Sequence, residues 1–203
     1  IDNILEAKKV LVKEMGSTLL TIAKDVKIQI EFNPTHVQSY RLIGYANRML
    51  AKQDFNDDTK DAGELGAGHT VTALYELVPA GTDDKAGGTV DDLKYQKTVS
   101  TPKAGSSGEV MMVKFRYKPP KDSVSELITV PVAAEYASWD KASPDMKFAA
   151  SVAGFGMLLR DSQHKGTWRF ADALKVARAA KGRDTDGYRA EFVNLAEKAS
   201  LLK

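Results

Sequence analysis

The hydrophobic period of this chain changes near residue 140, and that change limits the folds it can adopt. Before it, apolar and polar residues alternate, as in "VKIQIEF" (residues 26–32), where every second side chain is apolar. After it, apolar residues recur at spacings of three and four, as at Phe148, Val152, Phe155 and Leu159. Alternation is typical of a strand with one wet face, and the longer period is typical of an amphipathic helix. After an N-terminal helix over residues 2–14, we therefore expect strands first and helices last.

Six segments have the pattern of strands. Val26, Ile28, Ile30 and Phe32 are predicted to face the core from the first strand, with Lys27 on its wet face. Their hairpin-like spacing, with no helix between them, favours antiparallel pairing over a parallel α/β sheet. The predicted strands are 26–32, 39–47, 68–79, 93–99, 110–120 and 126–132, and the third is expected to be central.

Three amphipathic helices are predicted after the strands, over residues 143–162, 167–182 and 184–202. Ser143 is a suitable N-cap and Pro144 suits the first helical position, while Gly154 and Gly156 leave room for a close neighbour. Three apolar stripes must be buried, so we expect a helical cap on an antiparallel β-sandwich, an α+β fold. The predicted domains are an N-terminal helix with its linker (1–20), the sandwich (21–135) and the cap (136–203).

The overall charge argues against several classes of function. The 203 residues include 29 basic and 27 acidic side chains, a net charge of +2, and no long basic run. Nucleic acid is therefore a poor candidate partner. Cysteine is absent, which removes thiolate metal sites and cysteine nucleophiles. No apolar segment is long enough to predict a membrane span, and Ile1 in place of Met predicts a fragment of a longer protein.

The stretch "DFNDDTKDAGELGAGH" (residues 54–69) is the strongest candidate for a functional site. Asp54, Asn56 and Asp58 fall at alternate positions, as at the start of a calcium-binding loop, and Asp61 adds a further oxygen. The EF-hand pattern then fails, because Thr59 stands where Gly is required. We therefore keep two interpretations open: a weak cation site, with calcium as the candidate ion, or an acidic surface loop rich in turn-forming residues.

A catalytic interpretation of the same stretch is a further alternative. Glu64, Asp61 and His69 would supply an acid and a base to a hydrolase if folding gathered them in one cleft. The three histidines, His36, His69 and His164, have no metal-binding spacing, and neither a P-loop nor a nucleophile elbow is present. The sequence therefore predicts no catalytic residue and no cofactor with any specificity.

Several long phrases resemble one known family. They are "IDNILEAKKVLVKEMGSTLLTIAKDVKIQIEFNP", "SYRLIGYANRML", "DFNDDTKDAGELGAGHTVTALYEL", "FRYKPP", "KFAASVAGFGMLLRDS" and "GYRAEFVNLAEKA". Together they resemble the C-terminal domain of unknown function in bacterial proteins that carry a von Willebrand factor type A domain. The likeness runs from Ile1 to Leu202, apart from residues 80–109.

The resemblance implies a type A domain upstream, with residues 1–15 as the helix that leads out of it. It assigns no catalytic residue here. The metal motif DxSxS of a type A domain is expected upstream as well, because the nearest string, 122–126, has Val124 where the first Ser is required. We therefore expect a non-catalytic structural or binding module at the bacterial cell envelope, which accompanies the type A domain and takes part in recognising a protein ligand.

Overall fold

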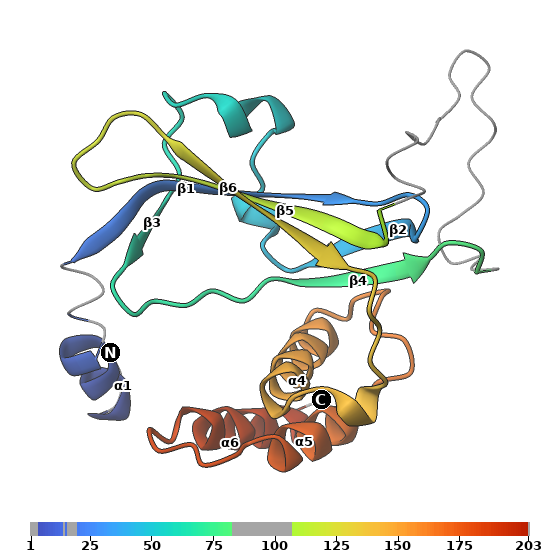
Figure 1. The fold of residues 1–203 in the computed structure, drawn as a ribbon. Coiled ribbons are helices and arrows are strands. Elements are labelled where there is room, and N and C mark those ends of the chain that lie inside the picture. The colour runs from blue at the N-terminus through green and yellow to red at the C-terminus, as the bar shows by residue number, and fades with distance from the viewer. Residues whose placement is uncertain (1–3, 14, 16–19, 83–106, 203) are drawn as a thin grey trace. The chain divides into compact units, whose positions relative to one another are not determined.

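The computed structural model describes residues 4–13, 15, 20–82 and 107–202. These residues divide into two compact units, each of which has its own architecture. The first comprises Ile1–Arg41, Tyr45–Val71 and Tyr75–Glu135, and it holds most of the strand residues. The second comprises Leu42–Gly44, Thr72–Leu74 and Tyr136–Lys203, and it holds the last three helices. The α+β class predicted from the sequence is confirmed (Figure 1).

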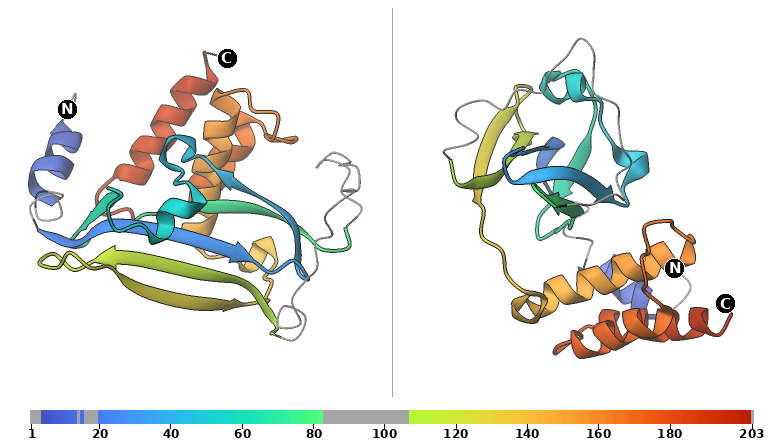
Figure 2. Two further views of the ribbon diagram at one scale, coloured as in Figure 1. Left: turned by 90° about the horizontal axis from the view of Figure 1, so that it is seen from above. Right: turned by 90° about the vertical axis from the view of Figure 1, so that its right-hand side faces the viewer.

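A four-stranded antiparallel sheet forms the centre of the first unit. Its order is β3-β1-β5-β6, with β1 (Thr21–Phe32) and β5 (Glu109–Lys118) in the middle. The edge strands are β3 (Gly63–Gly66) and β6 (Glu126–Ala133). β1, β5 and β6 run side by side in both views of Figure 2. Because Ile28 pairs with Phe115, and Phe115 with Ile128, the register places apolar side chains in rows across one face.

A second, two-stranded sheet contains β2 (Val37–Ile43) and β4 (Leu74–Pro79). Phe32, at the end of β1, joins the two sheets. Its ring centroid lies 4.3 Å from that of Tyr40 on β2 and 5.4 Å from that of Tyr75 on β4. Arg41 and Glu76 form an ion pair between the two strands of the small sheet. Six described strands therefore form two antiparallel sheets, as the predicted sandwich requires, and neither sheet closes into a barrel.

The third predicted strand differs from the prediction. Residues 68–79 were expected to form one central strand, but only Leu74–Pro79 is a strand, and it belongs to the small sheet. Gly68 has φ +77° and ends the turn after β3, which breaks the apolar run that the sequence suggested. β3 itself lies inside the stretch expected to be a loop. The predicted strand 93–99 lies outside the described residues.

The second unit contains three helices with a common core. They are α4 (Pro144–Leu159), α5 (Phe170–Ala179) and α6 (Tyr188–Ser200), close to the predicted ranges. The backbone N–H of Met146 donates to Ser143 Oγ at 3.1 Å, so the predicted N-cap is confirmed. The predicted stripe of α4 is partly wrong, because Val152 and Leu159 are exposed. The buried core consists of Phe155, Leu158, Ala173, Leu174, Ala177, Val193 and Ala196.

Short helices complete the described chain. At the N-terminus, α1 (Ile4–Lys8) continues into one π-helical turn, η1 (Lys9–Lys13), where the sequence predicted a single helix over 2–14. Three 3₁₀ turns lie in connections: η2 (Ala46–Arg48), η3 (Lys52–Asn56) and η5 (Trp139–Lys141). Of these, η3 bears most directly on the candidate site, because it begins the acidic stretch.

We predict opposite effects for two glycine substitutions in α4. A Cβ added at Gly154 would lie 2.5 Å from ring atoms of Trp168, which packs against this position. Gly154→Ala should therefore lower the free energy of unfolding by about 1–3 kcal/mol through overpacking. A Cβ at Gly156 meets nothing within 4 Å, so Gly156→Ala should raise it by about 0.5–1 kcal/mol. Urea unfolding followed by circular dichroism measures both, and equal effects would contradict this packing.

Candidate functional site

The stretch from Asp54 to Asp61, here named the acidic loop, folds back over the charged face of the four-stranded sheet. Phe55 anchors it: its side chain is buried, and the guanidinium carbon of Arg116 lies 5.4 Å from its ring centroid. Asp57 starts a tight turn in which its carboxylate accepts hydrogen bonds from the Thr59 N–H at 2.9 Å and from the Thr59 hydroxyl at 2.6 Å. The loop thus has an apolar anchor and a local turn of its own.

Lys27 holds the first half of the acidic loop through the loop's backbone. Its Nζ donates to the Asp54 carbonyl oxygen at 3.2 Å and also to the Asp57 carbonyl oxygen. The residue is only 3% exposed, although the sequence predicted it on the wet face of its strand. That prediction is wrong because the loop returns to cover the face on which Lys27 lies. Two backbone acceptors replace the water that the ammonium group loses.

Lys118 and Asp25 hold the second half of the loop. Lys118 Nζ lies 2.6 Å from Asp25 Oδ2 and donates to the Asp58 carbonyl oxygen at 2.7 Å. The Ala62 N–H donates to Asp25 Oδ1 at 3.2 Å. The hydrogen bond from Lys118 holds the pKa of Asp25 below its usual range, and the same contact raises the pKa of Lys118. Both groups therefore carry full charge at neutral pH.

A β-bulge brings Asp25 to this position. Lys24 pairs with Lys118 and Lys27 with Arg116, so β1 has one extra residue between the two pairs. Asp25 lies in this bulge and has φ +50°. This is a left-handed conformation that Asp tolerates better than most residues. The bulge places a carboxylate between two lysines, which the simple alternation of the strand did not predict.

Arg116 and Ser125 hold the middle of the acidic loop. Arg116 donates to Asn56 Oδ1 at 3.1 Å and to Ser125 Oγ at 2.8 Å, and the Ser125 N–H donates to Asp58 Oδ2 at 3.2 Å. The hydrogen bonds from Ser125 are the main reason why the pKa of Asp58 is lowered, and the charges of Lys118 and Arg116 add to it. Asp58 Oδ1 and Arg116 Nε are buried without a hydrogen-bond partner among the described residues.

The side chains of the four residues in the predicted cation site do not all point to one place. Asn56 and Asp58 lie together beside Arg116, whereas the Asp54 contact runs through its backbone carbonyl. Asp61 is exposed and acts on Lys118 only through its charge. Within the described ranges, no group of three or more His, Asp or Glu side chains is placed to hold a metal ion. Calcium binding at this loop therefore stays a prediction.

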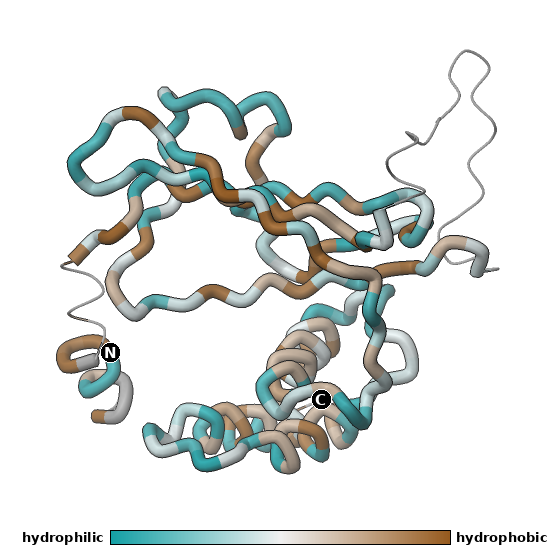
Figure 3. The backbone as a smooth tube through the Cα atoms, viewed as in Figure 1, coloured by the Kyte–Doolittle hydropathy of each residue, from teal (hydrophilic) through white to brown (hydrophobic). Residues whose placement is uncertain are grey.

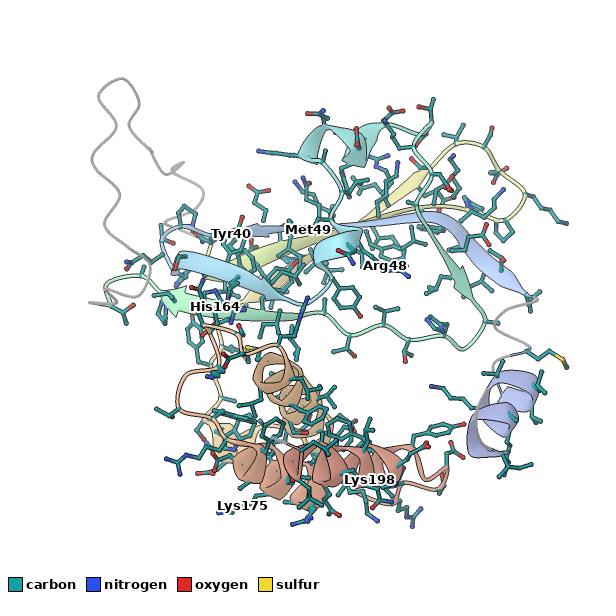
Figure 4. The ribbon with its side chains drawn as sticks, turned by 180° about the vertical axis from the view of Figure 1, so that it is seen from behind. Tyr40, Arg48, Met49, His164, Lys175 and Lys198 are labelled. Carbon is teal, nitrogen blue, oxygen red and sulfur yellow. The ribbon has the colours of Figure 1, made fainter. Side chains whose placement is uncertain are left out.

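The alternative catalytic residues lie on exposed parts of the first unit. Glu64, on the edge strand β3, accepts a hydrogen bond from the Thr21 hydroxyl at 3.3 Å. His69 follows in the turn after β3, where its backbone N–H donates to the Gly66 carbonyl oxygen at 3.1 Å. Glu64, His69 and Asp61 are all exposed to solvent. In the second unit, His164 lies in the connection between α4 and α5 and is exposed as well (Figure 4).

A second charged cluster lies at the start of α6. The Asp184 carboxylate accepts hydrogen bonds from the N–H groups of Arg189 at 3.0 Å and Ala190 at 2.7 Å. Burial opposes its ionisation, yet these hydrogen bonds keep its pKa below the usual range. Arg189 also pairs with Asp145 and lies 4.8 Å from the ring centroid of Phe148. The cluster borders an open depression, but its charges already pair with each other and tie α6 to α4.

Taken together, the first unit is an antiparallel scaffold whose acidic loop is held by cations from its own sheet. The chain matches the family model described as "Uncharacterized protein YfbK, C-terminal" over residues 17–202, and it belongs to that family. It is 42% identical over 199 residues to "Uncharacterized protein YfbK" of Escherichia coli (strain K12). The match covers 98% of this chain but 33% of the relative, so the chain spans about a third of that protein's length.

The other comparisons add two findings. No solved structure matches the chain. Among the residues that the structure describes, no helix combines the length and the apolar character that crossing a membrane requires.

We predict that removing the Lys27 ammonium group destabilises the fold. In Lys27→Met two backbone carbonyls lose their buried donor, so the free energy of unfolding should fall by about 1–3 kcal/mol. Lys114→Met is the matched control, because Lys114 forms a more exposed pair with Glu31, and should cost below about 1 kcal/mol. Chemical denaturation measures both variants. A Lys27→Met protein as stable as the control would contradict the role assigned to Lys27.

Proposed function

We propose that this chain is a non-catalytic structural and binding module that accompanies a von Willebrand factor type A domain in a protein of the bacterial cell envelope. The observation that carries the proposal is that polar groups of the acidic loop are hydrogen-bonded to cations of the sheet. Lys27 and Lys118 bind its backbone oxygens, and Arg116 binds the Asn56 side chain. The acidic loop, which the sequence offered as the strongest candidate site, is therefore hydrogen-bonded to the sheet through these groups.

Two features support a module that works beside another domain. The family description names a C-terminal region, and the E. coli relative is about three times as long as the part that this chain matches. The N-terminal helical segment lies before the matched range, and its side chains Ile4, Leu11 and Val12 are exposed. Apolar side chains on a short exposed helix favour a neighbour that covers them. A type A domain that precedes residue 1 would be that neighbour.

The mechanism that we propose is recognition at a surface. The metal site of the type A domain would coordinate the protein ligand, and the present module would supply rigidity and a second contact surface. A rigid neighbour lowers the conformational entropy that binding must overcome. The acidic loop and the bulge in β1 fit such a supporting role, because contacts within the protein hold them in place without a bound ligand.

One observation favours the alternative of a calcium-stabilised surface module. Asp58 Oδ1 is buried and has no hydrogen-bond donor among the described residues, which is a position that a cation would satisfy. The guanidinium of Arg116 lies close enough to act on the charge of Asp58, and a second cation there would be repelled. The non-catalytic module without calcium is therefore the better supported proposal. The hydrolase alternative has exposed side chains at Glu64 and His69 and no observation in its favour.

We predict that the module stabilises the domain before it. The test compares a full-length family polypeptide with a version that ends just before the position equivalent to residue 17. If the module binds the folded form of the preceding domain, that domain's melting midpoint should fall by several degrees when the module is removed. Differential scanning calorimetry measures the midpoint, and adding the separate module back in excess should restore part of it. An unchanged midpoint would contradict the proposal.

A further inference from the structure

One face of the four-stranded sheet has an uninterrupted set of apolar side chains. The pairing register aligns them in two rows across β1, β5 and β6, and we name this set the open face. One row contains Ile28, Phe115 and Ile128, and the other contains Ile30, Val113 and Val130. In an antiparallel sheet, directly opposed residues point to the same side, so these six side chains form one surface. Figure 3 shows apolar residues recurring along these strands.

Among the described residues, the second sheet contacts this side of the large sheet at the end where Phe32 lies. β1 has 12 residues and β5 has 10, whereas β2 has 7 and β4 has 6. The aromatic contacts between the sheets involve Phe32, at the last position of β1. Beyond that end, Ile28 is 56% exposed, Ile128 48% and Val130 49%. The apolar layer between the sheets therefore starts at Phe32 and continues through half-buried side chains to the exposed Ile28, Ile128 and Val130.

The opposite face of the sheet is covered in part, although Thr129 on that face is exposed. Lys27 and Arg116 lie there, and the acidic loop closes over them with the buried ring of Phe55. A half-solvated antiparallel sheet normally buries its apolar face and leaves its polar face in water. Here, in the described part of the first unit, the acidic loop covers Lys27 and Arg116 on the charged face. On the apolar face of the same part, Ile28, Ile128 and Val130 are exposed. The open face therefore has the composition of an interface and not that of a solvent surface.

We infer that the open face is the docking surface for the domain that precedes this one in the full-length polypeptide, and that the partner surface is apolar and uncharged. The inference rests on the proposed function, because it needs a preceding domain. The part of the relative that this chain does not match is about two thirds of its length, which is ample for such a domain. The six side chains of the open face carry no charge, so an aliphatic partner surface fits them best.

The sequence position of β1 favours this partner. β1 is the first strand of the chain, and its residue Ile28 belongs to the open face. Residues 1–20 would link it to the proposed preceding domain, and that stretch contains the exposed Ile4, Leu11 and Val12. A domain tethered by so short a segment has an effective concentration in the millimolar range. Even a small apolar contact would then be formed most of the time.

Thiol labelling tests the inference directly, because the chain has no cysteine of its own. Ile128→Cys and Val130→Cys each place one thiol on the open face. Thr129→Cys is the matched control, because Thr129 is exposed on the same strand and its side chain points to the other face. Each variant is prepared in the 203-residue chain and in the longer polypeptide with the preceding domain, and its labelling rate with a maleimide is measured.

We expect Ile128→Cys and Val130→Cys to react about tenfold more slowly in the longer polypeptide, with the rate of Thr129→Cys unchanged. Slow labelling already in the 203-residue chain would overturn the inference, because this chain would then cover its own open face. Protection that appears only at high protein concentration would overturn it in favour of a second copy. Circular dichroism confirms that each variant folds, and either open-face variant alone suffices for the comparison.

The same experiment separates this inference from the proposed function. If the module raises the melting midpoint of the preceding domain but leaves the open-face thiols equally reactive, the proposed function stands and the docking surface lies elsewhere. If neither the midpoint nor the labelling changes, both proposals fail.

Discussion

The buried ammonium group of Lys27 is the contact on which the first unit most depends. A lysine that is 3% exposed must recover the hydration it loses, and here it does so with the carbonyl oxygens of Asp54 and Asp57. These acceptors belong to the backbone of the acidic loop. The hydrogen bonds that replace the hydration of Lys27 therefore also hold the loop in place. Lys118 repeats the arrangement with the Asp58 carbonyl oxygen and the Asp25 carboxylate. The loop and the sheet therefore stabilise each other.

The cations of β1 and β5 bind the loop through its backbone carbonyl oxygens and the Asn56 side chain, and Lys118 also pairs with Asp25 of β1. These contacts cover Lys27 and Arg116 on the charged face, while Ile28, Ile128 and Val130 on the apolar face are exposed in the described part of the first unit. The division follows from the register, which places Lys27 beside Arg116 on one face and Ile28 beside Phe115 on the other.

Much of the fold could be predicted from local sequence, and the site could not. The switch from alternation to helical spacing predicted α4, α5 and α6, and Ser143 is the N-cap as expected. Alternation also predicted Lys27 to be exposed to water, which is wrong. The pattern of a strand does not show that a loop about thirty residues later returns to cover that face. Pairs of residues that are far apart in the sequence, such as Asp25 and Lys118, cannot be recognised from the residues around either one. The acidic loop was identified as the important stretch, but its contacts depend on residues far away in sequence.

In the proposed module, the oxygens of the acidic loop serve to fasten it to the sheet and not to bind a cation. The most direct measurement is thermal unfolding of the chain in millimolar calcium and in excess chelator. A ligand at about 100 times its dissociation constant raises the free energy of unfolding by about 2.7 kcal/mol, which a melting curve resolves easily. We expect identical midpoints under the two conditions. A midpoint several degrees higher in calcium, abolished by Asp58→Asn, would contradict this role for the loop.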